Sequence, residues 1–287
     1  MKATRTEDWT VLSMMEWATD YFAERGIPDA RHSIEWLLAE VLEVKRLDLY
    51  LKFDRPLSRT ELEELRPMVK RRASHEPLQY ITGYTDFMNA RITVGPEVLI
   101  PRIETEQLVE IILEYEEADS LRALDLGTGS GCISIALKQE RPGWELHAVE
   151  LSPEALKTAR RNAEANGTDV HFLHGDMTAW RELPLEGPFD LIVSNPPYVR
   201  PGEKDGLQKQ VADHEPAEAL YCEDLKAMYG SIRDAAAELL ADDGRLYLEI
   251  HENNPGEILD LFDRSGWQAR MVKDYEKKPR FVLASRT

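Results

Sequence analysis

Apolar side chains in residues 1–76 recur three and four positions apart, which is the spacing of one face of an α-helix. Two such stripes stand on either side of a break at residues 26–29; they are Val11, Met15, Ala18 and Phe22, and then Ile34, Leu37, Leu38, Val41 and Leu42. A further helix is expected from Ser58, because Ser58-Arg59-Thr60-Glu61 has the pattern of a capping box. We therefore expect about four short helices in a small bundle. The pattern leaves open whether its apolar faces form only a core or also contact a partner.

The pattern changes at Pro77, which ends the last helix. Residues 77–98 carry β-branched and aromatic side chains and predict a hairpin or linker. From residue 99 to residue 287, strand-like apolar runs alternate with helical stretches, which is typical of an α/β domain. Residues 200–222 are rich in charge and turn residues, and we expect them to form a long loop, a lid or a binding surface. The last elements are expected to be a helix over 224–240 and strands over 245–250, around Met271 and over 281–283.

A glycine-rich turn follows the strand-like run at 121–126 and precedes a helical stretch. Glycines permit positive φ and a close approach of ligand to backbone, and the helix N-terminus presents free amides. A dinucleotide fingerprint would need its third glycine at position 132, where Cys132 stands. The spacing resembles instead the first motif of S-adenosylmethionine-dependent methyltransferases. In that resemblance Asp125 places the methionine part, and the turn passes under the ligand; the turn is Gly127, Thr128, Gly129, Ser130 and Gly131.

The next two strands also end in candidate ligand residues. Glu150 ends the run at 144–149, where a carboxylate can accept hydrogen bonds from both ribose hydroxyls. Asp176 and Met177 follow the run at 170–174, where methyltransferases of this class commonly hold the adenine edge. Ligands of open α/β sheets bind at the carboxyl ends of the strands, so we expect these residues to share one site.

The strand-like run at 189–194 ends in Asn195-Pro196-Pro197-Tyr198. Two prolines fix φ and remove two backbone donors, and Asn195 is held extended by the proline after it. Such a stiff loop suits binding of a planar NH2 group. We expect the Asn195 side-chain carbonyl and the Pro196 backbone carbonyl to stabilise positive charge that develops on the nitrogen. Tyr198 is expected to stack on the amide plane, so that most of the acceleration comes from positioning.

The 287 residues contain 35 Lys and Arg against 53 Asp and Glu, a formal net charge of −18 that disfavours binding to phosphate backbones. The basic triplet Lys70-Arg71-Arg72 is interpreted as a solvated last turn of a helix. Two unpaired cysteines, no signal peptide and no membrane-spanning run predict a cytoplasmic protein. His171 and His174 should face opposite sides of a strand, so we expect no metal site.

Taken together, these motifs resemble the PrmC/HemK family, bacterial N5-glutamine methyltransferases of peptide chain release factors. The resemblance spans nearly the whole chain and is carried by residues 76–83, 98–106, 125–131 and 195–198. It implies a class I S-adenosylmethionine-dependent methyltransferase (Rossmann-like) domain over 99–287 and an N-terminal helical substrate-recognition domain over 1–76. The implied substrate is the glutamine of the Gly-Gly-Gln motif in class I release factors. S-adenosylmethionine would be the methyl donor and S-adenosylhomocysteine the product.

Three segments depart from the family pattern: Ile103 replaces a proline, residues 222–229 replace a glycine-rich segment, and His251 replaces a glycine. All three lie outside the ligand motifs. Two other substrates remain open on the chemistry, a glutamine of a ribosomal protein and an amine of a nucleic-acid base, although the charge of −18 argues against nucleic acid. A cofactor-binding module without catalysis is the third alternative. We expect no membrane association and no direct nucleic-acid substrate.

Overall fold

The computed structural model describes residues 9–263 and 266–286, so the expectation about a signal peptide at Met1 lies outside the described residues. The chain divides into two compact units, each of which has most of its residue contacts within itself. Unit 1 consists of Met1–Gly83 and Gln208–His214, and unit 2 of Tyr84–Leu207 and Glu215–Thr287. The chain therefore passes between the units three times.

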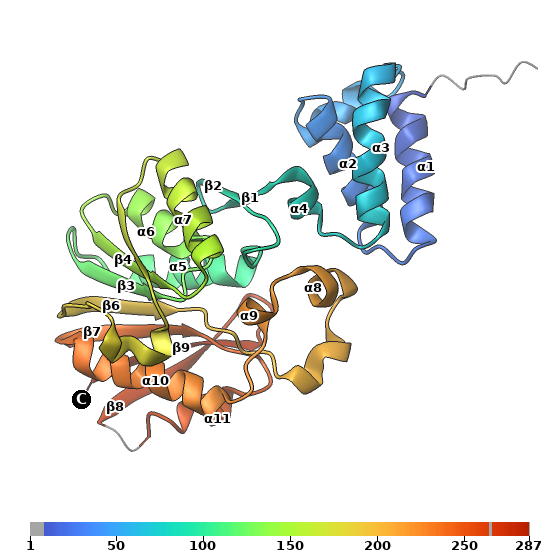
Figure 1. The fold of residues 1–287 in the computed structure, drawn as a ribbon. Helices are drawn as coiled ribbons and strands as arrows, with labels where there is room; N and C mark the ends of the chain where they lie inside the picture. The colour runs from blue at the N-terminus through green and yellow to red at the C-terminus, as the bar shows by residue number, and fades with distance from the viewer. Residues whose placement is uncertain (1–8, 264–265, 287) are drawn as a thin grey trace, which may run out of the picture. The chain divides into compact units, whose positions relative to one another are not determined.

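Unit 1 is helical (Figure 1), as its apolar stripes predict. The side chains of these stripes meet in one core. Its elements are α1 (Val11–Ala23), α2 (Ala30–Val41), η1 (Arg46–Leu51), α3 (Arg59–Ala73), α4 (Leu78–Thr82) and α8 (Lys209–His214). Phe22 and Ile34 are fully buried where α1 packs on α2. The predicted capping box is confirmed, because the Glu61 amide donates to Ser58 Oγ and the Ser58 amide donates to the Glu61 carboxylate. Such a cap satisfies free amides at the start of α3.

The basic triplet does lie in the last turn of α3, but the interpretation of that turn as solvated is wrong for Arg72. Arg72 is only 3% exposed. Its guanidinium donates to Ser33 Oγ (3.0 Å), to the Glu76 carbonyl (2.9 Å) and to Gln210 Oε1 on α8 (2.9 Å). These acceptors satisfy the buried donors, which is the condition for burying a guanidinium. Sequence alone did not place α8 next to α3.

Unit 2 contains a short antiparallel hairpin and a seven-stranded mixed sheet. The hairpin strands are β1 (Tyr84–Phe87) and β2 (Ala90–Thr93). The sheet has the order β5-β4-β3-β6-β7-β9-β8. Its strands are β3 (Arg122–Leu126), β4 (Glu145–Glu150), β5 (Val170–His174), β6 (Phe189–Ser194), β7 (Leu240–Glu249), β8 (Trp267–Lys273) and β9 (Pro279–Arg286). The strands predicted from the apolar runs are all present.

Strand order creates a switch point between β3 and β6. The chain leaves β3 towards β4 and β5 and then returns to β6 on the other side of β3, all in parallel. Strands β8 and β9 complete the sheet with antiparallel pairs. A switch point leaves a crevice at the carboxyl ends of the strands, which is where ligands bind in such sheets.

Helices cover both faces of the sheet (Figure 1). In one group α5 packs on α6 and α6 on α7; in the other, α10 packs on η2 and α11. These helices are α5 (Ile103–Tyr115), α6 (Cys132–Glu140), α7 (Pro153–Ala165), η2 (Met177–Glu182), α10 (Leu225–Leu239) and α11 (Pro255–Leu259). No helix within the described ranges is long and apolar enough to cross a membrane.

The expected loop at residues 200–222 is not structureless, and that prediction was wrong. It contains η3 (Pro201–Gly206), α8 and α9 (Ala217–Leu220). Pro201 stands at the first position of η3 and Pro216 caps α9, two positions where a fixed φ favours a helix start. The turn residues that suggested a loop are therefore the ends of short helices.

Candidate active site

A cavity of about 530 Å³ lies at the carboxyl ends of the parallel strands, at the switch point. Most residues that the sequence assigned to the site line it: Gly127, Thr128, Gly129, Ser130, Glu150, Asp176, Met177, Asn195 and Pro197. The others assigned there, Asp125, Gly131, Pro196 and Tyr198, do not line the cavity wall. Residues 97–99, Thr105 and helix α9 are among the other residues that line it, and no sequence motif had assigned them to the site.

The turn after β3 needs its glycines. Gly127, Gly129 and Gly131 have φ of 78°, 57° and 84°, in the left-handed region that side chains rarely adopt. A Cβ on Gly131 would come within 3.2 Å of Ala159 Cβ, whereas one on Gly129 would meet no atom within 4 Å. Gly131 thus allows close packing on α7, and Gly129 leaves open space beside the cavity.

Asp125 is fully buried beneath this turn. Its Oδ2 accepts hydrogen bonds from Thr128 Oγ1 (2.6 Å) and Ser134 Oγ (2.9 Å). Its Oδ1 is buried and has no hydrogen-bond partner within residues 9–263 and 266–286. Burial raises the pKa of the carboxyl to about 6, although the two hydroxyl donors lower it. A buried acceptor without a partner costs free energy of folding. A cationic group of a ligand could supply the missing hydrogen bond to Oδ1.

Glu150, at the end of β4, is held by backbone amides on both sides. Its Oε2 accepts from the Gly129 amide (2.8 Å) and its Oε1 from the Ser152 amide (2.9 Å). Each carboxylate oxygen has two lone pairs, so both can still accept a hydroxyl hydrogen. Asp176 is fixed similarly, since its Oδ1 caps η2 by accepting from the Thr178 amide (2.7 Å). These side chains present fixed acceptors to the cavity.

The loop after β6 is tied to a buried carboxylate that sequence reasoning missed. Asn195 Nδ2 donates to Thr105 Oγ1 (3.1 Å), and Thr105 Oγ1 donates to Glu249 Oε2 (2.8 Å). Tyr198 Oη donates to the other oxygen, Glu249 Oε1 (3.0 Å). Glu249 has no exposed surface, and Tyr229 Oη donates to its backbone carbonyl (2.8 Å). The sequence signals available were Thr105 in the 98–106 segment and an acid at the end of an apolar strand.

Comparison with known proteins identifies the family of the chain. Residues 13–83 match the family described as PrmC N-terminal domain, and residues 87–215 match the Methyltransferase small domain. A release factor glutamine methyltransferase of Geobacter sulfurreducens is 40% identical over 265 residues, covering 92% of each chain. Another with this name, of Chlorobaculum tepidum, is 39% identical over 281 residues, covering 95% of this chain and 96% of that one. The chain belongs to the release factor glutamine methyltransferase family. The resemblance stated from the motifs is confirmed.

Family membership also confirms the fold class, a class I S-adenosylmethionine-dependent methyltransferase domain with an N-terminal helical domain. Among solved structures, a methyltransferase from Pyrococcus furiosus aligns with a TM-score of 0.49 and 20% identity, over 68% of this chain and 87% of that chain.

The release factor methyltransferase segment at 98–106 is anchored within unit 2 by Glu215. The Arg102 guanidinium pairs with Glu215 Oε1 (2.5 Å), and the Ile100 amide donates to Glu215 Oε2 (3.2 Å). Ile103, the first departure from the family pattern, is 66% exposed and takes no part in these contacts. The segment is therefore held by Ile100 and Arg102 before Ile103, and after it by Thr105, which donates to Glu249.

The other two departures lie close to the loop after β6. His251 packs edge-on against the Tyr198 ring, with centroids 5.7 Å apart. In the 222–229 segment, Cys222 is buried and its amide donates to the Val199 carbonyl (2.8 Å). The predicted stacking of Tyr198 on a substrate amide stays a prediction, and its hydroxyl is fixed by Glu249.

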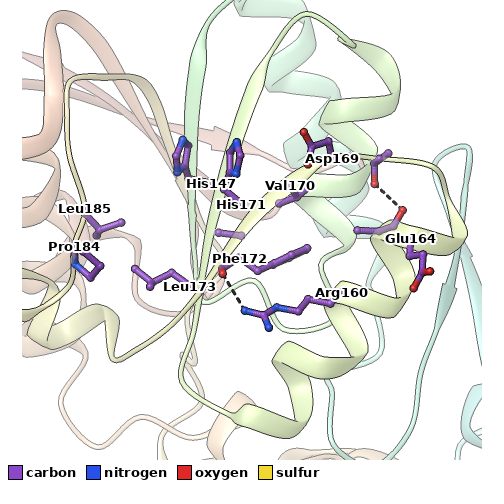
Figure 2. Close-up of a pocket in the computed structure, with 13 residues that line it drawn as sticks. His147, Arg160, Glu164, Asp169, Val170, His171, Phe172, Leu173, Pro184 and Leu185 are labelled. Carbon is purple, nitrogen blue, oxygen red and sulfur yellow. Dashed lines mark hydrogen bonds between the residues drawn. The ribbon is translucent and has the colours of Figure 1, made fainter.

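A second hollow, of about 580 Å³, lies along the edge strand β5, and Figure 2 shows the His147 and His171 rings side by side in it. The ligand atoms of these two side chains and of Glu145 lie within 4.8 Å of one another. His147 lies 24 positions before His171 in the sequence and comes next to it because β4 pairs with β5. Because Arg122 Nε already donates to Glu145 Oε1 (3.3 Å), a cation there would face a guanidinium. We assign this cluster no metal.

Proposed function

We propose that this protein transfers a methyl group from S-adenosylmethionine to the side-chain amide nitrogen of the glutamine in the Gly-Gly-Gln motif of class I peptide chain release factors. Family membership supports the substrate class, because relatives that match over most of both chains are named release factor glutamine methyltransferases. The observation that carries the chemistry is the position of Asn195, in the same cavity as the glycine turn and Glu150.

The methyl donor fits residues that line the cavity together with Asp125, which is buried beneath the glycine turn. Asp125 Oδ1, the unpaired buried acceptor, suits the α-ammonium of the methionine part. Glu150, held by two backbone amides, suits the ribose hydroxyls, and Asp176 with Met177 suits the adenine edge. S-adenosylmethionine supplies an electrophilic methyl group on a sulfonium. The protein contributes the fixed acceptors that bind and orient it.

The amide nitrogen of glutamine is a poor nucleophile, because its lone pair is delocalised into the carbonyl. As the N–C bond forms, the nitrogen becomes positively charged, the S–C bond breaks, and one N–H proton is finally released to solvent. Asn195 Oδ1 and the Pro196 carbonyl accept hydrogen bonds from the two N–H groups of the substrate amide, so that negative dipoles face the nitrogen where the charge develops. Because Asn195 Nδ2 donates to Thr105, the amide oxygen is the group left for the substrate. Positioning supplies most of the remaining acceleration.

The test is mass spectrometry of a purified, unmethylated release factor after incubation with this protein and S-adenosylmethionine. We expect one added methyl group on the glutamine of the Gly-Gly-Gln peptide, and none on a release factor with alanine at that position. The variant Asn195→Ala should bind S-adenosylhomocysteine and lose the transfer. An unmodified release factor, with cofactor binding intact, would overturn the proposal and direct the search to ribosomal proteins first and nucleic acids second.

A further inference from the structure

Asn195, Thr105 and Glu249 form a chain of hydrogen bonds that runs from the cavity to a fully buried carboxylate. The distances are 3.1 Å from Asn195 Nδ2 to Thr105 Oγ1 and 2.8 Å from Thr105 Oγ1 to Glu249 Oε2. Sheet register explains why the residues meet. Ser194 pairs with Leu248 across β6 and β7, so the next residues on the two strands, Asn195 and Glu249, lie side by side.

The direction of each bond follows from the chemistry of its partners. An ionised carboxylate only accepts hydrogen bonds. The Thr105 hydroxyl must therefore donate to Glu249, which leaves its oxygen as an acceptor towards Asn195. The group of Asn195 that faces Thr105 is then the NH2, and the Asn195 oxygen must point the other way. A side-chain amide that lacked this constraint could turn over and present two donors to the substrate.

We propose that Glu249 and Thr105 are positioning residues that hold the Asn195 amide with its oxygen towards the substrate nitrogen. This inference rests on the proposed role of Asn195 as the acceptor for the substrate amide. The same carboxylate also accepts from Tyr198 Oη at 3.0 Å, so both ends of the 195–198 loop are fixed to one group. The buried Glu249 carboxylate thus determines that the oxygen of the Asn195 amide, and not its NH2 group, faces the substrate.

A purely structural role for Glu249 predicts something different. A buried carboxylate is usually paired with an opposite charge, which offsets part of the cost of its burial. In the part of the chain that the structure describes, both hydrogen bonds to its side chain come from hydroxyls, of Thr105 and Tyr198. Arg280 is the nearby cation, but its guanidinium donates to Asp274 (3.3 Å) and Glu252 (3.2 Å). Glutamine at 249 could make as many hydrogen bonds at less desolvation cost, but would not impose their direction.

Protonation of Glu249 should weaken this constraint. Burial raises the pKa of its carboxyl to about 7, while the bonds from Thr105 and Tyr198 lower it. A protonated carboxyl can donate to Thr105, whose hydroxyl can then donate to Asn195 and favour the reversed amide. The ionisable groups that face Glu249 come from several elements; they are Glu104 on α5, Cys132 on α6, Tyr198 after β6, Tyr229 on α10 and Arg280 on β9. Of these, Glu104 raises the pKa and Arg280 lowers it.

The first experiment compares Thr105→Val, which keeps the shape and removes the hydroxyl, with the matched control Thr105→Ser, which keeps the hydroxyl. At saturating S-adenosylmethionine we expect kcat of the valine variant to fall about 10–100-fold, below the usual loss for a group at the reacting atoms. The serine variant should recover to within about threefold, and both should bind S-adenosylhomocysteine as the unmodified protein does. Equal kcat in the valine variant and the unmodified protein would overturn the inference.

The second experiment uses pH, and its first readout comes from the unmodified protein. In the unmodified protein, kcat at saturating S-adenosylmethionine should fall as the pH drops through about 7. Glu249→Gln should have a lower kcat and lack this acid limb, because a glutamine cannot ionise. Protonation of Asp125 is separable, since it changes the affinity for the cofactor and not the saturated rate. A flat profile in the unmodified protein contradicts the inference.

A readout without substrate separates this inference from the proposed function. The side-chain 15NH2 signals of Asn195, identified by their loss in Asn195→Asp, should shift with a midpoint near pH 7 in the unmodified protein. They should not titrate in Glu249→Gln. If the Asn195 signals titrate in the unmodified protein and not in Glu249→Gln, while no release factor is methylated, the proposed function is wrong and the positioning role of Glu249 stands. If release factors are methylated while the signals ignore pH, the positioning is wrong and the function stands.

Discussion

Asp125→Asn should make the protein without ligand more stable and its binding of the cofactor weaker. The substitution removes a charge and preserves the size of the side chain. Its oxygen can replace Oδ2 and accept from the hydroxyls of Thr128 and Ser134. The amide nitrogen then stands at the place of Oδ1, which is buried and has no partner among the described residues. That is where we expect the α-ammonium of the methionine part. In the variant the side-chain NH2 group and the ammonium, both donors, would face each other there.

The size of the stability effect follows from the pKa. Burial raises the pKa of Asp125 from 3.8 to about 6, so its ionised form destabilises the folded state. The penalty is absent below about pH 4, develops between about pH 4 and 6, and is complete above that. A rise of about two units corresponds to roughly 3 kcal/mol. Urea unfolding at pH 7.5 should therefore show the asparagine variant more stable by up to about 3 kcal/mol, and the difference should vanish near pH 4.

The size of the binding effect follows from the lost ionic hydrogen bond. Hydrogen bonds to charged groups contribute about 1.5–3 kcal/mol, which corresponds to about 10–150-fold in Kd. Isothermal titration calorimetry with S-adenosylhomocysteine measures this loss. The control ligand is 5′-methylthioadenosine, which lacks the amino-acid part and should bind the variant and the unmodified protein equally well.

Two results would refute this reasoning about Asp125. Equal weakening of both ligands would mean that the substitution distorts the whole glycine turn. A stability difference that does not change between pH 4 and 7.5 would mean that burial of the charge is not its cause. The variant Ser134→Ala provides a contrast, because it removes one donor to the carboxylate. It should lower stability at pH 7.5 and leave the position of Oδ1 unchanged.

Other substitutions test the remaining contacts. Glu150→Gln should weaken S-adenosylhomocysteine and 5′-methylthioadenosine alike, by about 1–2 kcal/mol in the same titration, because both contain the ribose; an effect on only one ligand contradicts this role. Arg102→Ala leaves the Glu215 carboxylate buried without its cation, so urea unfolding should show a loss of about 2–4 kcal/mol. Adding Glu215→Gln should restore part of that loss, and no recovery would count against the pairing. Ser58→Ala should cost about 1 kcal/mol by removing the cap of α3, whereas Ser58→Asp should be nearly neutral.

Local spacing predicted the parts of the site that depend on neighbouring residues. The glycine turn and Asn195 directly follow strands, and Glu150 is the last residue of one, so an apolar run and its end were enough to place them at one edge of the sheet. Helices α1, α2 and α3 of unit 1 could be predicted for the same reason, since their stripes and the Ser58 cap are short-range patterns, whereas α4 and α8 fell in segments expected to be a hairpin or a loop. The family resemblance supplied the roles.

Contacts between distant segments could not be predicted in this way. Thr105 and Glu249 are 144 residues apart and meet because β7 lies beside β6 and α5 begins next to their ends. Neither residue belongs to a spacing pattern that links it to Asn195. The burial of Arg72 has the same origin, because its acceptor Gln210 is 138 residues away on α8. The composition around α8 predicted a long loop.

Membership of α8 in unit 1 affects how this protein could be recombined with its relatives. A fragment that ends at Gly83 would lack Gln210, one of the acceptors of the buried Arg72 guanidinium. It would also lack His214, whose Nε2 lies 3.3 Å from the Ser74 carbonyl. A chimera that exchanges only the first 83 residues would therefore join an α3 and an α8 from different parents. Exchange of residues 208–214 together with that segment should preserve both contacts, and substitutions in α8 should accompany substitutions at the end of α3 across relatives.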